Sequence, residues 1–266
     1  MNARLFAINW RPARAEIAFA RAAGFGALQF NGREQGIDTE YLGDAAELVA
    51  ELLVAAGIEA VMEIVVRLRE DGRTEAGNTP LDLLRTNAAA AHALGCTRVH
   101  LHLTMTAALP WAARKAIEAA AVAQLHAGLD LVADRFLLGI EHNEPDIPLF
   151  AELDAISALL EAVPGLGFVW DCNHTPEAQQ AAWLTLAPRI QLAHVSDTPQ
   201  PQVNHHLPLG AGTMDFGVLF AELRRRGVAC PAILEIGGTP KSGGFGRDTD
   251  AALRASLAVM RAAGVG

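Results

Sequence analysis

The sequence has little of what several classes of protein require. Only three of its 266 residues are cysteines, Cys96, Cys172 and Cys230, and no two have CxxC spacing, so neither a disulfide framework nor a zinc knuckle is indicated. Positive charge is also scarce, with 21 Lys and Arg against 30 Asp and Glu, for a net charge of −9. Because nucleic acids and anionic membranes attract basic surfaces, we expect neither as a partner.

Long apolar runs are missing as well. No stretch reaches the roughly 20 apolar residues that cross a bilayer, and the N-terminal segment MNARLFAINWRPARAE has no apolar signal-peptide core. We therefore expect a cytoplasmic protein. Hydrophobic residues are nevertheless abundant, at 51% against 19% charged, which is enough to bury a large core and excludes a disordered chain.

These hydrophobic residues fall in short runs that alternate with longer amphipathic stretches. Eight runs read as buried parallel strands, at residues 5–10, 27–32, 58–66, 97–104, 136–143, 166–174, 190–197 and 232–238. Helical patterns separate them, and several end in glycine, such as Gly24 and Gly57. Eight such units predict a single-domain α/β protein, a (β/α)8 TIM barrel over residues 1–266. A doubly wound open sheet is the alternative, but no GxGxxG follows the first strand.

Unusual polar residues gather at the ends of the expected strands. Seven of the nine histidines lie on strands or in the loops that leave them: His100, His102, His142, His174, His194, His205 and His206. Three carboxylates, Glu141, Asp171 and Glu235, also end apolar strands, where burial is costly unless the charge is paired or bound to a cation. Barrel active sites form at this end of the strands. Together with His194 these carboxylates suit Mn²⁺, Co²⁺ or Mg²⁺, and Zn²⁺ is also compatible.

Three motifs in this order resemble a known family. Asp171 and His174 form DxxH, His194 begins HVSD, and His206 begins HLPLGAGTMDF. The whole chain resembles the xylose isomerase-like barrels, the sugar isomerases and epimerases grouped with endonuclease IV. The resemblance implies one divalent metal ion held by Glu141, Asp171, His194 and Glu235, with the two glutamates also acting as an acid–base pair. It also implies a homo-oligomer.

The resemblance implies chemistry on a small sugar or polyol. A metal that chelates a carbonyl and its neighbouring hydroxyl acidifies the α C–H and stabilises the resulting enediolate. Two carboxylates on opposite sides of the enediolate plane can remove a proton from one face and return one to the other face of the same carbon, which gives epimerisation, whereas return to the neighbouring carbon gives isomerisation. We expect a sugar isomerase or epimerase acting on a small ketose, aldose or hydroxy-ketone. Candidate substrate-binding residues are His174, His206, His102, Trp10, Asn9 and Lys241.

The sequence also departs from the family pattern. Gln200 stands where ketose 3-epimerases have an arginine, and Gln29 stands where a glutamate is common. An inosose-dehydratase-like lyase therefore remains an alternative, since the same enolisation starts that reaction. An endonuclease IV-like repair enzyme fits less well, because Asn204 replaces an expected aspartate and the chain is acidic. A non-catalytic sugar-binding barrel would also use this fold, and structural ion pairs at the rim would also use these carboxylates.

Overall fold

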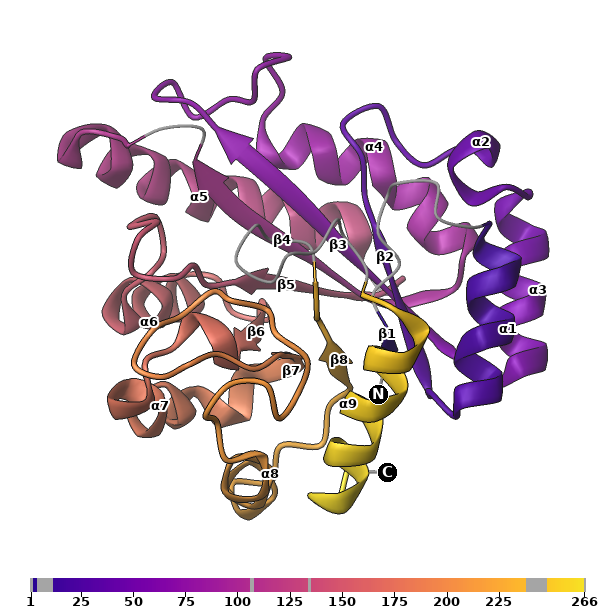
Figure 1. The fold of residues 1–266 in the computed structure, drawn as a ribbon. Helices are drawn as coiled ribbons and strands as arrows, with labels where there is room; N and C mark the ends of the chain where they lie inside the picture. Colours follow the sequence, from indigo (N-terminus) through magenta and orange to yellow (C-terminus); the bar gives the residue numbers. More distant parts are fainter. Residues whose placement is uncertain (1, 4–11, 106–107, 134, 238–247, 266) are drawn as a thin grey trace.

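Eight parallel strands form one sheet in the computed structural model, which describes residues 2–3, 12–105, 108–133, 135–237 and 248–265. Their order is β1-β8-β7-β6-β5-β4-β3-β2, and the end strands β1 and β2 contact each other, so the sheet nearly closes (Figure 1). This confirms the predicted α/β TIM barrel. The strands are β1 Asn2–Ala3, β2 Ala27–Asn31, β3 Glu59–Leu68, β4 Cys96–Met105, β5 Leu137–Glu141, β6 Gly167–Asp171, β7 Ile190–Val195 and β8 Ala232–Leu234.

Helices surround the outer side of the sheet (Figure 1). They are α1 Ala13–Ala23, α2 Thr39–Leu42, α3 Ala46–Ala56, α4 Pro80–Ala93, α5 Trp111–Val132, α6 Leu153–Ala162, α7 Glu177–Trp183, α8 Phe216–Arg225 and α9 Asp250–Ala262. Gly24 and Gly57 end α1 and α3 with φ of 87° and 67°, the left-handed conformation expected at these positions. Among the described helices, none is both long and apolar enough to traverse a membrane.

Several predicted element boundaries differ from the structure. The expected first strand, 5–10, lies outside the described residues. The expected strand 166–174 ends at Asp171, because the carboxylate of Asp171 accepts a hydrogen bond from the Asn173 N–H and caps a 3₁₀ turn at Cys172–His174. The amphipathic pattern EAQQAAWLTLA at residues 177–187 predicts one helix, but the structure has an α-helix only to Trp183 and then a 3₁₀ helix over Leu184–Arg189, which contains Pro188.

Side-chain alternation along the strands builds two cores. The outward-facing apolar residues, such as Ile64, Leu101 and Trp170, belong to the large cluster packed between sheet and helices. The second cluster consists of four fully buried inward residues, Val61, Val169, Leu192 and Ile233, which fill the barrel interior. We call these four the interior plug. It closes the barrel below the polar residues described next.

Candidate active site

The interior plug fixes the height of the candidate site in the barrel. Asp171, His194 and Glu235 each follow a plug residue by two positions, on β6, on β7 and directly after β8. Because side chains two apart on a strand share a face, these three point into the barrel one layer above the plug. Glu63 follows Val61 on β3 in the same way. The apolar plug and the polar layer above it therefore both follow from the alternation of side chains between the two faces of each strand.

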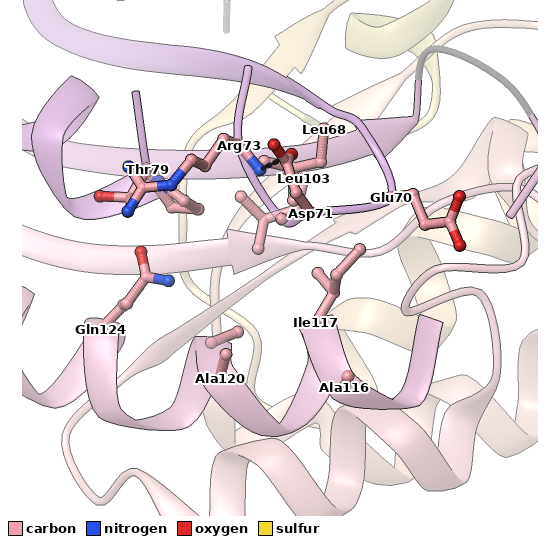
Figure 2. Close-up of a pocket in the computed structure, with 13 residues that line it drawn as sticks. Leu68, Glu70, Asp71, Arg73, Thr79, Leu103, Ala116, Ile117, Ala120 and Gln124 are labelled. Carbon is pink, nitrogen blue, oxygen red and sulfur yellow. Dashed lines mark hydrogen bonds between the residues drawn. The ribbon is translucent and has the colours of Figure 1, made fainter. Parts of the chain in front are cut away.

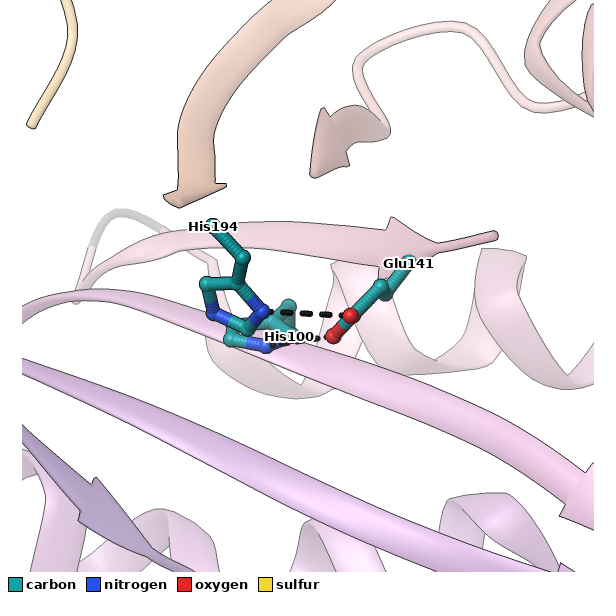
Figure 3. Close-up of side chains that lie close together, drawn as sticks. All are labelled: His100, Glu141 and His194. Carbon is teal, nitrogen blue, oxygen red and sulfur yellow. Dashed lines mark hydrogen bonds and ion pairs between the residues drawn. The ribbon is translucent and has the colours of Figure 1, made fainter. Parts of the chain in front are cut away.

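The four predicted metal ligands meet in this polar layer. One ligand atom from each of Glu141, Asp171, His194 and Glu235 lies within 4.8 Å of the others, and all four side chains are buried. His194 Nδ1 lies 3.1 Å from Glu141 Oε1 and 2.7 Å from Glu235 Oε2. Figure 3 shows His194 and Glu141 pointing toward each other, with His100 beside them. The geometry brings together the side chains chosen from sequence, while their role as ligands stays a prediction.

The donor set fits a divalent cation. Glu141 Oε2 and Asp171 Oδ2 are buried and accept no hydrogen bond of normal geometry. The nearest imidazole nitrogens, of His100 and His174 respectively, lie 3.2 Å from these oxygens. Buried carboxylate oxygens without hydrogen bonds are unfavourable unless a cation compensates them. Three carboxylates and one imidazole, with no thiolate, form the oxygen-rich set that suits Mn²⁺, Co²⁺ or Mg²⁺ and also accommodates Zn²⁺.

A buried amide orients His194. Gln29, on β2, donates from Nε2 to Glu63 Oε2 at 3.1 Å, which leaves its Oε1 to accept from His194 Nε2 at 2.9 Å. His194 therefore carries a proton on Nε2 and presents Nδ1 to Glu141 and Glu235. This is the usual arrangement of a ligand histidine, whose second nitrogen donates to a neighbouring acceptor.

Negative charge in the polar layer changes the ionisation of the neighbouring imidazoles. Burial disfavours the charged form of His102, but the carboxylates of Glu141 and Glu63 outweigh burial and raise its pKa to about 10. His102 Nδ1 lies 3.3 Å from Glu63 Oε1, and its Nε2 lies 2.8 Å from Asn143 Oδ1. Burial likewise opposes ionisation of Glu141, yet the charges of His102 and His194 hold its pKa well below the usual value. The layer is therefore a network of compensating charges.

A cavity of about 360 Å³ opens above this layer at the carboxyl ends of the strands. We call it the barrel-mouth cavity. Three of the predicted substrate-binding residues, His102, His174 and His206, line it together with Glu235. The other three candidates, Trp10, Asn9 and Lys241, lie outside the described residues. The cavity is at the lower end of the size range of small-molecule sites.

Backbone carbonyls fix two of the lining histidines. His174 Nδ1 donates to the carbonyl of His142 at 2.9 Å, and His206 Nδ1 donates to the carbonyl of Glu235 at 3.1 Å. In His174 this turns Nε2 toward Asp171 Oδ2 at 3.2 Å and Glu144 Oε2 at 3.8 Å. The 3₁₀ turn after β6 thus carries His174 back over the cavity.

The expected grouping of histidines at the rim is wrong for His142. Glu141 points into the barrel, so the next residue points outward, and His142 packs against Trp183 with ring centroids 4.2 Å apart. Burial lowers the pKa of His142 to about 3, so its imidazole is neutral in the packed layer. His142 therefore has a structural role between the barrel wall and α7.

Gln200, which replaces the arginine of the resembling epimerases, also serves the scaffold. Its Oε1 accepts from the Glu177 N–H at 2.9 Å at the start of α7. Its Nε2 lies 3.5 Å from the carbonyl of Thr175. Gln200 is not among the described residues that line the barrel-mouth cavity.

A second cavity, of about 310 Å³, lies between the end of β3, the following loop and α5 (Figure 2). Its floor is apolar, with Leu68, Leu103 and Ile117. Its polar lining is held by neighbours, since Arg73 donates to the carbonyl of Gly77 and Gln124 accepts from the Leu81 N–H. None of the described residues lining it is a histidine, so this lining lacks the imidazoles of the barrel mouth.

Glu63, Gln29 and His100 are not among the site residues predicted from sequence, although all three contact the predicted ligands or their partners. His100 Nε2 lies 3.2 Å from Glu141 Oε2, and Gln29 bridges His194 and Glu63. Alternation along β4 puts His100 on the same face as His102, as the sequence predicts, and both side chains face the site although only His102 is among the predicted site residues. The Gln29 contact depends on two strands that are far apart in the sequence.

Comparisons with known structures agree with this architecture. L-ribulose 3-epimerase is similar at 17% identity with a TM-score of 0.78, over 99% of this chain and 96% of that one. D-psicose 3-epimerase, solved in the presence of D-fructose, has 15% identity and a TM-score of 0.77 over 100% of both chains. The probable 3-DHS dehydratase of Bacillus anthracis has 18% identity and a TM-score of 0.73, over 98% and 99%.

Identities this low establish the fold alone. Among curated proteins, none matches the chain in sequence. A family model does match, over residues 17–263, and its description is xylose isomerase-like TIM barrel. This span contains all four side chains that meet at the candidate metal centre and nearly every described element. The chain belongs to the xylose isomerase-like TIM barrel family.

Proposed function

We propose that the protein is a divalent-metal-dependent sugar isomerase or epimerase that acts on a small ketose, aldose or hydroxy-ketone. The observation that carries this proposal is the convergence of Glu141, Asp171, His194 and Glu235 within 4.8 Å beneath the barrel-mouth cavity. The fold-level similarity to two ketose 3-epimerases supports the same reaction class. A divalent cation bound there would polarise a substrate carbonyl and its neighbouring hydroxyl.

The side chains supply the proton transfers in this proposal. Glu141 on β5 and Glu235 after β8 approach His194 from different strands, so they can serve as base and acid on a substrate between them. Glu141 is ionised at neutral pH because of its imidazole neighbours, as a base must be. His174, which lines the cavity and whose Nδ1 is held by a carbonyl, would contact a substrate oxygen.

The test uses two variants and a substrate panel. We expect Glu141→Gln and Glu235→Gln to lose more than about 1,000-fold in kcat on any ketose, aldose or hydroxypyruvate that the wild type converts with Mn²⁺, Co²⁺ or Mg²⁺. Circular dichroism should show both variants folded. The matched control Glu118→Gln lies on α5, where the carboxylate pairs with Lys115, and it should retain full activity. Full activity in either site variant would contradict the acid–base assignment.

A dehydratase is the second candidate, supported by the similarity in fold to the probable 3-DHS dehydratase. Both reactions begin with removal of an α proton, so the same buried residues would serve either. Mass spectrometry of the product separates them, because epimerisation and isomerisation conserve mass while dehydration removes one water per turnover.

A further inference from the structure

Arg67 is the feature of the barrel-mouth cavity that the proposed chemistry leaves without a role. Among the described residues that line the cavity, it is the only lysine or arginine. Its side chain is exposed, and within the described part of the chain it makes no hydrogen bond or ion pair. Arg69, two residues further along, is paired with Asp71 at 3.0 Å. A guanidinium in a concave site and without a carboxylate partner can bind an anion.

Strand register places Arg67 at the outer end of the cavity. Glu63, Val65 and Arg67 alternate on the inner face of β3, and Val65 is the register partner of His102 on β4. At about 3.3 Å per residue, Arg67 begins about 7 Å beyond the layer of His102 and about 13 Å beyond Glu63. Arg67 therefore lines the cavity further along β3 than the proposed reaction centre, on the side where the far end of a substrate would lie.

A hydroxyl accompanies the guanidinium. Thr104 is the register partner of Arg67, shares the inner face of β4 with His100 and His102, and lines the same cavity. The three carboxylates that line the cavity are engaged by other groups. Glu63 contacts Gln29 and His102, Glu144 contacts Asn204 and His174, and Glu235 contacts His194. Arg67 and Thr104 thus form a donor pair on adjacent strands, which is the composition of a small anion site.

We propose that the barrel-mouth cavity takes a substrate with a terminal anionic group, a phosphate or a carboxylate, which Arg67 and Thr104 bind at the end remote from Glu141 and Glu235. This inference rests on the proposed function, because it assigns the substrate class of that site.

The test compares matched substrates that differ only at the terminal carbon. Each ketohexose is offered as the neutral sugar, the 6-phosphate and the 6-carboxylate, for example D-fructose, D-fructose 6-phosphate and D-fructuronate. Turnover is measured with Mn²⁺, and binding of the same compounds is measured by calorimetry on the full chain without added metal. The variants are Arg67→Gln, Arg67→Lys and the matched control Arg69→Gln, which removes the same charge outside the cavity.

We expect one of the two anionic forms to exceed the neutral sugar in kcat/KM and to bind more tightly. Arg67→Gln should weaken its binding by about 10- to 100-fold and leave the neutral sugar within about two-fold. Arg67→Lys should retain part of the effect, and Arg69→Gln should have none. Preference for the phosphate or for the carboxylate identifies which anion the site takes.

Two results separate this inference from the proposed function. The anion site would be overturned, and the isomerase proposal kept, if the protein converted neutral ketoses but bound neither anionic form more tightly. In that case Arg67→Gln would also leave the binding of the anionic forms unchanged. Arg67-dependent binding of an anionic sugar without conversion of any compound would support the anion site and contradict the isomerase.

Discussion

His194 is held by a residue 165 positions earlier in the chain, and this contact determines which of its nitrogens faces the candidate metal centre. Gln29 accepts the Nε2 proton, so Nδ1 points at Glu141 and Glu235. Glu63 in turn accepts from Gln29 and fixes the orientation of its amide. At the scale of single residues, the site therefore depends on a second set of side chains behind the proposed ligands.

Removing the Gln29 amide should weaken metal binding. We expect Gln29→Met, which has a similar length but cannot accept the proton, to lower Mn²⁺ affinity by about 10- to 100-fold, because His194 loses its orienting partner. Titration calorimetry measures the affinity. The control Gln124→Met removes an amide that caps the Leu81 N–H far from the site and should leave the affinity unchanged. Equal affinities in both variants would contradict the orienting role of Gln29.

The four proposed ligands could be chosen from sequence because Glu141, Asp171 and Glu235 end apolar strands and His194 lies near the end of another. The carboxyl ends of barrel strands share one rim. The contact of Gln29 with His194 could not be predicted from sequence, because it depends on how β2 and β7 are placed across the barrel. Strand alternation could have predicted that His142 points outward, because His142 directly follows the inward-pointing Glu141. The sequence could not predict that Gln200 bonds to the start of α7, because that contact depends on the conformation of a loop.

At the scale of elements, the segment after β7 is organised by one carboxylate. Asp197 accepts from the backbone N–H groups of Thr198, Gly210 and Met214 at 2.8, 2.7 and 3.2 Å. This segment also carries His206, whose φ of 49° lies in the left-handed region that non-glycine residues rarely adopt. Asp197 thus anchors the loop that positions one wall of the barrel-mouth cavity.

Truncation of this anchor should be costly. We expect Asp197→Ala to lower the free energy of unfolding by about 3 kcal/mol, because three amides lose a charged acceptor. Asp197→Asn keeps one acceptor oxygen and should lose less. Urea denaturation followed by circular dichroism gives both values. A loss below about 0.5 kcal/mol in the alanine variant would show that the loop is held by other contacts.

The start of α4 gives a pH-dependent contribution to stability. Thr79 and Asp82 form a capping box, and hydrogen bonds from the Thr79 side chain and backbone lower the pKa of Asp82. A carboxylate with a lowered folded-state pKa stabilises the fold above its unfolded pKa of about 3.9, and this contribution is lost as pH falls through the folded value. We expect Asp82→Asn to cost about 1 kcal/mol at pH 7.

Urea denaturation of wild type and Asp82→Asn between pH 7 and pH 3 checks this sign. The difference in free energy of unfolding between wild type and Asp82→Asn should be constant down to about pH 4 and should become smaller at lower pH. Asp154→Asn, at the start of α6, where the N-cap residue makes no side-chain hydrogen bond, is the control and should show a smaller difference. If the free energy of unfolding of wild type and of Asp82→Asn differed more at low pH than at pH 7, the ionised Asp82 carboxylate would not be the stabilising form.

At the scale of the whole molecule, the barrel is closed internally by the interior plug of Val61, Val169, Leu192 and Ile233, which supports the polar layer above it. The number and period of the strands predicted this barrel from sequence. The segregation of two cores, one inside and one outside the sheet, follows from alternation and becomes visible only once the register is known.

Loss of a plug residue should destabilise the entire fold. We expect Leu192→Ala, which is fully buried, to lower the free energy of unfolding by about 2 to 5 kcal/mol through lost burial and the cavity left behind. Leu137→Ala, at a position 54% exposed on β5, should change it by less than about 1 kcal/mol. Thermal or urea denaturation measures both variants. Similar losses of unfolding free energy in Leu192→Ala and Leu137→Ala would contradict the packing of the interior plug as a core.

The measurement that tests the central claim most directly is the stoichiometry and affinity of metal binding by titration calorimetry. We expect one Mn²⁺ or Co²⁺ per chain, and Asp171→Asn should weaken binding by at least about 100-fold, since a direct ligand should matter at least as much as the groups that orient it. Unchanged binding in Asp171→Asn would contradict the proposed centre, as would three zinc ions per chain.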